Sequence, residues 1–179
     1  MTTTHTALSF GSVWDVPRFP SVDACMAIGC NTQWLTGLIS ASPVVYPLGR
    51  DEVVERVKRR MFLFKFRTVF HLALMRAISS VLPLAVARDL SRVCVEAENL
   101  FPADLAPDGR PRYLVIAPVS KVSRMFVREA GEPELTVEDL ASVGDDPAEP
   151  RIVLDVTAIF DQVVEGLDLL EVAGELLDD

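Results

Sequence analysis

The chain has 179 residues, half of them hydrophobic, and a formal net charge of −9. This length suits one domain or two small ones, and the apolar content excludes a chain that is disordered throughout. The most apolar stretch, residues 61–86, is interrupted by Lys65, Arg67, Arg76 and Pro83. A membrane-spanning helix is therefore not expected.

The first six residues, Met-Thr-Thr-Thr-His-Thr, have neither the basic start nor the apolar centre of a signal peptide. Three cysteines and two histidines are too few for a disulfide framework or a typical zinc site. The glycines are scattered and form no phosphate-binding loop. We therefore expect a cytoplasmic protein that holds no metal and no cofactor.

The chain begins with an expected irregular arm over residues 1–18. Ser21 is placed to cap a helix over residues 22–28, and Gly29 suits the left-handed position that ends such a helix. A second short helix is expected over residues 33–39, capped by Asn31 or Thr32.

A longer connection follows the two short helices. Residues 44–46, Val-Val-Tyr, look like a short strand, and the aromatic-rich residues 61–66 favour another. Helical periodicity then predicts helices over 68–81 and 84–99, the second with Pro83 in its first turn.

The character of the sequence changes after residue 100. Three prolines and an Asp-Gly pair mark residues 101–111 as a linker. Beyond it, Thr136 with Asp139 three residues later resembles a capping box, and Thr157 is expected to cap a last amphipathic helix. Strands are expected over three further segments, residues 113–117, 122–129 and 152–156.

Charge is distributed unevenly between the two parts of the chain. Residues 1–100 hold 11 Lys/Arg and 8 Asp/Glu, a balance of +3, whereas residues 101–179 hold 6 and 18, a balance of −12. Such asymmetry is typical of a chain with two separate roles. The basic cluster of the first part has six members: Arg56, Lys58, Arg59, Arg60, Lys65 and Arg67.

The two short helices have the composition of a helix-turn-helix. Ala24 and Cys25 are small enough for close approach, and Leu35 and Leu38 are spaced to pack the second helix on the first. Four polar residues are then left on the outside, and we expect them to contact bases in the major groove: Asn31, Thr32, Gln33 and Thr36. Gln can pair with adenine, and Thr can contact a phosphate or a thymine methyl.

The segment 19–98 resembles the winged helix-turn-helix domain of MerR-type proteins. The matching positions are Ala24, Ile28, Gly29, Leu35, Arg60, Phe62, Val69, Leu72, Ile78, Leu82, Leu84 and Ala87. The resemblance implies a wing strand that follows the helix pair and carries basic and aromatic residues. The basic residues expected to contact phosphates there are Arg56, Lys58, Arg59, Arg60 and Lys65.

The chain departs from the MerR pattern in three places. The stretch 40–60, between the recognition helix and the wing strand, is longer than usual. The long C-terminal dimerisation helix and the cysteine arrangement of the metal sensors are both missing. The family's effector and its promoter-untwisting mechanism are therefore not carried over to this chain.

These patterns together predict an α+β protein with two domains. A winged helix-turn-helix domain is expected over residues 19–100, and a small α/β domain for dimerisation or regulation over 112–179. The expected function is that of a non-enzymatic, sequence-specific double-stranded DNA-binding protein, a bacterial or phage transcription regulator that reads the major groove with helix 32–39. A homodimer is expected because one recognition helix buries little surface.

Several alternatives stay open on the sequence alone. The helix pair could instead bind protein, as in a phage packaging or accessory factor. The C-terminal domain could bind a protein partner or a small effector through the apolar face of its last helix, or that face could pack on the N-terminal domain. Trp34 could stack on a base or sugar, or pack under the wing. His71 could act as a base, but no nucleophile motif accompanies it.

Overall fold

The computed structural model describes residues 16–40, 44–48, 50–56, 59–96, 110–129, 132 and 135–167. The protein is mixed α+β, 49% helical and 19% strand, which confirms the expected fold class at that level. The arm expected over 1–18 lies outside the described residues up to residue 15, and the linker expected over 101–111 lies outside them up to residue 109.

The described elements follow one another in two groups. The first group runs from β1 to α5: β1 (Phe19–Pro20), α2 (Ser21–Ile28), α3 (Thr32–Ser40), the 3₁₀ turn η1 (Arg50–Glu52), β2 (Val53–Arg56), β3 (Arg59–Phe64), α4 (Phe66–Ser79) and α5 (Leu84–Glu96). The second group runs from β4 to α7: β4 (Arg112–Ala117), β5 (Val122–Val127), α6 (Val137–Ala141), β6 (Ile152–Asp155) and α7 (Val156–Gly166).

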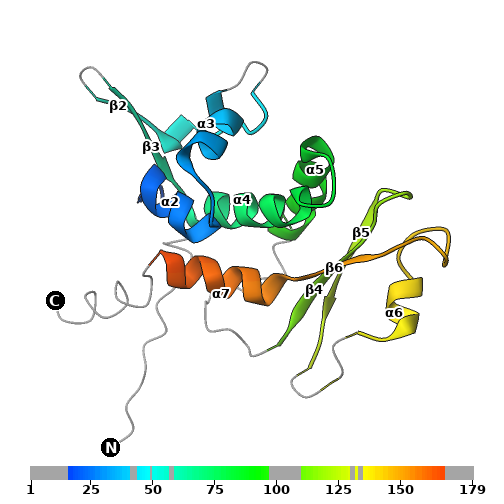
Figure 1. The fold of residues 1–179 in the computed structure, drawn as a ribbon. Coiled ribbons are helices and arrows are strands. Elements are labelled where there is room, and N and C mark those ends of the chain that lie inside the picture. Colours follow the sequence, from blue (N-terminus) through cyan, green and yellow to red (C-terminus); the bar gives the residue numbers. More distant parts are fainter. Residues whose placement is uncertain are drawn as a thin grey trace, which may run out of the picture.

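The described strands form two antiparallel sheets of three strands each. In the first the order is β1-β3-β2, with Phe19 opposite Phe64 and Val53 opposite Phe62. In the second the order is β5-β4-β6, with β4 in the centre. Figure 1 shows the β2–β3 hairpin extending from one end of the molecule, and the second sheet with α6 at the other.

The helix α4 lies at the centre of the core. Its buried residues, from Phe66 to Ile78, occupy nearly every face, as expected of a helix that is surrounded by other elements. α2 and α5 pack on it from the first group, and α7 packs on both α2 and α4 from the second. Phe160 of α7 makes edge-to-face contacts with Phe66 and Phe70, at centroid distances of 5.5 and 5.6 Å.

The second sheet separates the main core from a smaller one. Leu114 and Ile116 of β4 belong to the main core, together with residues of α2, α4 and α7. Val115 and Ala117 face the other side and pack with Val143 into the small cluster next to α6. This alternation explains why every residue of β4 is buried.

The structure corrects three local expectations. α2 begins at Ser21 itself, so Pro20 takes the cap position that was expected of Ser21. α7 is capped by the side chain of Asp155, which accepts from the Ala158 amide at 2.9 Å, and not by Thr157. The hydroxyl of Thr157 instead accepts a hydrogen bond from the Arg112 amide.

The third correction concerns residues 44–46, which form no strand although all three are described. They follow the end of α3 and form a bend there, because the amides of Val45 and Tyr46 both donate to the carbonyl of Leu38. The expected capping box is confirmed, since Thr136 and Asp139 bond reciprocally at the start of α6. No helix within the described ranges is long and apolar enough to cross a bilayer.

Candidate functional site

The corner between α2 and α3 is closed by backbone geometry. Gly29 adopts a left-handed conformation with φ 68°, and the amides of Gly29 and Cys30 donate to the carbonyls of Met26 and Cys25. This is the conformation in which glycine costs least, and it satisfies carbonyls that the end of a helix leaves unpaired. The side chain of Asn31 accepts from the Trp34 amide at 2.8 Å and caps α3.

Small residues allow the two helices to lie close to the rest of the core. Ala24 and Cys25 are buried on α2, and Leu35 and Leu38 are buried on α3, as the sequence predicts; Ala27 of α2 is also buried. Apolar contact fixes the inner faces of both helices, so the outer face of α3 is left for polar residues.

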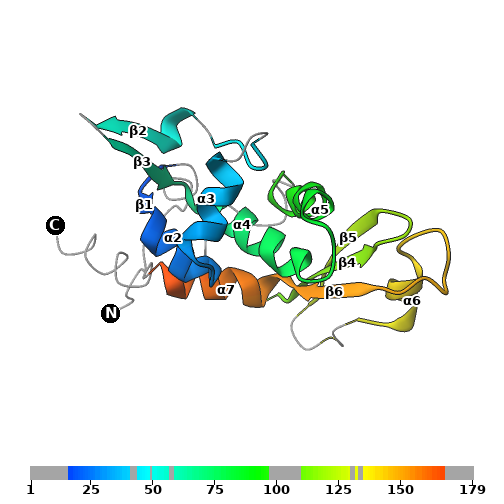
Figure 2. The same cartoon turned by 45° about the horizontal axis from the view of Figure 1, so that its top comes forward.

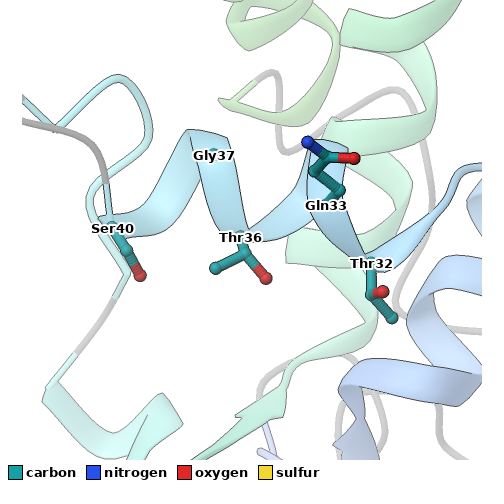
Figure 3. Close-up of a pocket in the computed structure, with 5 residues that line it drawn as sticks. All are labelled: Thr32, Gln33, Thr36, Gly37 and Ser40. Atoms are coloured by element: carbon teal, nitrogen blue, oxygen red, sulfur yellow. The ribbon is translucent and has the colours of Figure 1, made fainter.

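The outer face of α3 is polar and carries no charge. Thr32, Gln33 and Thr36 are exposed, as is the capping residue Asn31. Together with Gly37 and Ser40, the first three line an open depression of about 500 Å³. In the view of Figure 3 the side chains of Thr32, Thr36 and Ser40 extend downward from the helix and that of Gln33 extends upward, and all of them line the same depression.

Trp34 packs inside the protein. The guanidinium of Arg76, on α4, lies 5.6 Å from the centre of the Trp34 ring, within the range of a cation–π contact. The ring is half-buried against the main core. Of the two alternatives that the sequence leaves open, the structure therefore supports packing, and it places the ring against α4.

The hairpin β2–β3 carries three of the five residues expected to contact phosphates. Backbone pairing places Arg56 opposite Arg59 and Glu55 opposite Arg60, next to the turn of the hairpin. The side chains of these residues, and Lys58 as a whole, lie outside the described residues. The hairpin and α3 lie at the same end of the molecule in both views (Figures 1 and 2).

Lys65 does not lie where the sequence predicts. The residue is only 8% exposed, and it occupies the cap position between β3 and α4. Its backbone amide donates to the carboxylate of Glu52 at 2.9 Å, which ties η1 to the start of α4. The strand ends before Lys65 and the chain turns inward into α4, so the expected phosphate contact at this residue is corrected.

A buried polar network next to α3 is not predicted by the sequence. The hydroxyl of Tyr46 lies 2.9 Å from Nδ1 of His71, and Nε2 of His71 lies 2.8 Å from Oγ of Ser91. His71 is 7% exposed and Ser91 is fully buried. The sequence contains one indication of this network: His71 lies between Phe70 and Leu72 on an apolar helix, and a buried histidine needs a polar partner.

The cysteines of the corner are not arranged as a metal site. Cys25 is buried, Cys30 is half-buried, and both are free thiols. Burial, followed by the neighbouring Cys25, raises the pKa of Cys30 to about 12. No group of three potential metal ligands occurs within the part of the chain that the structure describes.

Comparisons of the chain with protein-family models, with curated proteins and with solved structures return no match.

Proposed function

We propose that the protein is a sequence-specific double-stranded DNA-binding protein, a transcription regulator with a MerR-like winged helix-turn-helix. In this proposal α3 enters the major groove and the β2–β3 hairpin lies along the phosphates. The observation that carries it is the uncharged polar face of α3, with Thr32, Gln33 and Thr36 exposed, at the same end of the molecule as the arginine-bearing hairpin.

The order of the elements supports a winged helix. A short strand, two helices and a two-stranded hairpin follow one another, and the sheet order is β1-β3-β2. The tight corner at Gly29 leaves one side of α3 open. An exposed helix with hydroxyl and amide side chains has the donors and acceptors needed for base edges.

The pairing of Arg56 with Arg59 supports a phosphate-binding role for the hairpin. Like charges directly opposite one another weaken an antiparallel pair. A hairpin sequence rich in arginine suits phosphate anions, and each neutralised phosphate contributes a salt-dependent free energy of binding.

The location of one group of acidic residues is consistent with this orientation. α6 and the loop 144–149, which contain Glu138, Asp139, Asp145, Asp146 and Glu149, lie at the end of the molecule opposite the hairpin (Figure 1). Repulsion between these carboxylates and DNA therefore does not oppose docking through α3. A homodimer would place two copies of α3 on successive half-sites.

A double substitution tests the proposal. We expect Arg59→Ala with Arg60→Ala to weaken binding to every duplex and to flatten the dependence of affinity on salt by about one to two units of slope. Gln33→Ala should instead change which sequences are preferred. Affinity would be measured by fluorescence anisotropy across a salt series, first with random genomic fragments and then with selected duplexes.

The matched control removes two cations from the far end of the molecule. Lys121 and Arg124 are exposed, next to the β4–β5 turn and on β5. Lys121→Ala with Arg124→Ala changes the net charge by the same amount and should leave the salt slope unchanged. Equal effects of the two double variants, or no effect of the hairpin variant, would refute the wing assignment.

One observation favours a second candidate function, the binding of protein by the helix pair. Val22 and Met26 lie one turn apart on α2 and are 61% and 70% exposed. Exposed apolar side chains at this spacing suit a protein partner. Binding through them would respond weakly to salt, whereas DNA binding weakens steeply as salt rises.

A further inference from the structure

The segment that follows α3, residues 44–48, bonds to three helices: α3, α5 and α4. The amides of Val45 and Tyr46 both donate to the carbonyl of Leu38, in the last turn of α3, at 3.1 and 3.0 Å. Nη1 of Arg88, on α5, donates to the carbonyl of Val45 at 3.1 Å. Residues 45 and 46 thereby connect the end of α3 to α5, and they satisfy a carbonyl that α3 itself leaves without a partner.

The side chain of Tyr46 adds a connection to α4. Its hydroxyl lies 2.9 Å from Nδ1 of His71, and the two rings meet edge to face at a centroid distance of 5.2 Å. Burial, followed by the nearby Glu52 carboxylate, raises the pKa of Tyr46 above its ordinary value, so the phenol keeps its proton.

One arrangement of protons satisfies the groups of the network. In it the Ser91 hydroxyl donates to the carbonyl of Arg88 at 3.0 Å, and Nε2 of His71 donates to Ser91 at 2.8 Å and also lies 3.4 Å from the Arg88 carbonyl. A neutral imidazole carries one proton, and with that proton on Nε2 its Nδ1 is an acceptor. In this arrangement the Tyr46 hydroxyl donates to Nδ1 of His71.

We infer that Tyr46 and His71 are positioning residues for the recognition helix: the bond between them fixes the segment that holds the C-terminal end of α3. The inference rests on the proposed DNA-binding function. It adds to that function the residues of the core that orient α3. Neither side chain contacts DNA in this proposal. Thr36 and Ser40, on the last two turns of α3, are the groups whose placement depends on the bond.

Loss of the Tyr46 hydroxyl should affect specific binding more than general binding. Without it, Nδ1 of His71 is left buried with one fewer partner, and the segment 44–48 loses a contact with α4. Base contacts require side chains placed to within about half an ångström, whereas phosphate contacts by long cationic side chains tolerate more movement. The affinity for a preferred sequence should therefore fall, and the affinity for unrelated duplexes should not.

The test compares Tyr46→Phe with Ser91→Ala. Each variant removes one hydroxyl from the same imidazole, but of the two residues only Tyr46 bonds directly to α3, through its backbone amide. The probes are a short duplex that the wild-type chain selects from a randomised library, and a scrambled duplex of the same length. We expect Tyr46→Phe to bind the selected duplex about fivefold to tenfold more weakly, the equivalent of one buried hydrogen bond, and Ser91→Ala to change this affinity less than twofold.

Two variants of His71 give an independent comparison. An asparagine oxygen lies close to where Nδ1 lies in histidine, and the glutamine amide reaches the position of Nε2. His71→Asn keeps an acceptor for Tyr46, and His71→Gln keeps a donor for Ser91. Binding of the selected duplex should survive better in His71→Asn. If Tyr46→Phe keeps full affinity, or if all four variants lose affinity in proportion to their loss of thermal stability, the positioning role is refuted.

Amide hydrogen exchange separates this inference from the proposed function, because it needs no DNA. The Val45 and Tyr46 amides should exchange faster in folded Tyr46→Phe than in wild type, and at the wild-type rate in Ser91→Ala. If exchange is faster only in Tyr46→Phe, the connection between Tyr46 and α3 is supported. If the same chain binds no duplex, the DNA-binding function is refuted while the connection to α3 stands. Unchanged exchange in Tyr46→Phe would refute the connection itself.

Discussion

Single residues at the corner follow rules that can be applied to the sequence directly. Gly29 ends α2 in the left-handed conformation that glycine adopts most easily, and Asn31 caps the first turn of α3. Lys65 and Tyr46 do not follow such rules. Their placement depends on Glu52 and His71, partners that are distant in the sequence, and no local pattern identifies those partners.

Cys30 gives a prediction at this scale. Its pKa of about 12 means that the thiol keeps its proton at pH 8. The thiolate fraction falls by about three orders of magnitude relative to a free cysteine, and the greater nucleophilicity of a basic thiolate restores part of the rate. We expect iodoacetamide to modify Cys30 about a hundredfold more slowly than free cysteine at pH 8, as measured by peptide mass spectrometry over time.

Unfolding supplies the control for Cys30. In concentrated urea the same peptide should be alkylated at the rate of free cysteine, because the burial that raises the pKa is lost. Rapid alkylation of Cys30 in the folded protein would contradict the burial and the thiol contact with Cys25 on which the raised pKa depends.

At the scale of elements, periodicity predicts most of the helices and strands, but it does not predict their partners. The cap of α7 illustrates the limit. Asp155 and Thr157 are both good capping residues, and only the pairing of β4 with β6 decides between them, because the Thr157 hydroxyl is used by the Arg112 amide. The apolar face of α7 similarly predicts burial, and the structure shows that the face packs on α2 and α4.

Gly166 gives a prediction at this scale. A methyl group at this position would lie 2.6 Å from Cα of Ala27, where α7 and α2 are in contact. Alanine is favoured over glycine within a helix by about 1 kcal/mol, but a clash with backbone atoms cannot be relieved by a side-chain rotation. We expect Gly166→Ala to reduce the free energy of unfolding by about 1–3 kcal/mol, as measured by urea denaturation.

Gly37 is the matched control for Gly166. It also lies within a helix, α3, but an added methyl group meets nothing within 4 Å. Gly37→Ala should therefore raise the free energy of unfolding by up to about 1 kcal/mol. If both glycine variants stabilised the protein, α7 would not pack on α2 as closely as described.

At the scale of the whole molecule, the two domains expected from the sequence share one core. Leu114 and Ile116 of β4 and Phe160 and Val163 of α7 belong to the same cluster as the residues of α2 and α4. The side chain of Gln162 also donates to the carbonyl of Ala27 at 3.2 Å, close to the corner. The change in composition near residue 100 predicts a domain boundary, but composition gives no information about how the two parts pack together.

A cut in the connecting segment tests the shared core. We expect the protein, once cleaved at a protease site inserted between residues 101 and 109, to stay together in size-exclusion chromatography without denaturant. Either part alone should lose its cooperative unfolding transition, because its core would expose apolar residues such as Phe66 or Phe160. Two parts that separate and each unfold cooperatively would show that the domains are independent.

The contact between α7 and α2 also has a consequence for biosynthesis. The helix pair leaves the ribosome long before α7 is translated, yet Ala27 of α2 obtains part of its burial from α7. The nascent corner therefore exposes apolar surface until residue 166 has emerged, and chaperones that recognise such surface have that interval in which to bind. Synonymous codons that slow translation between residues 110 and 166 would lengthen the interval without changing the mature protein.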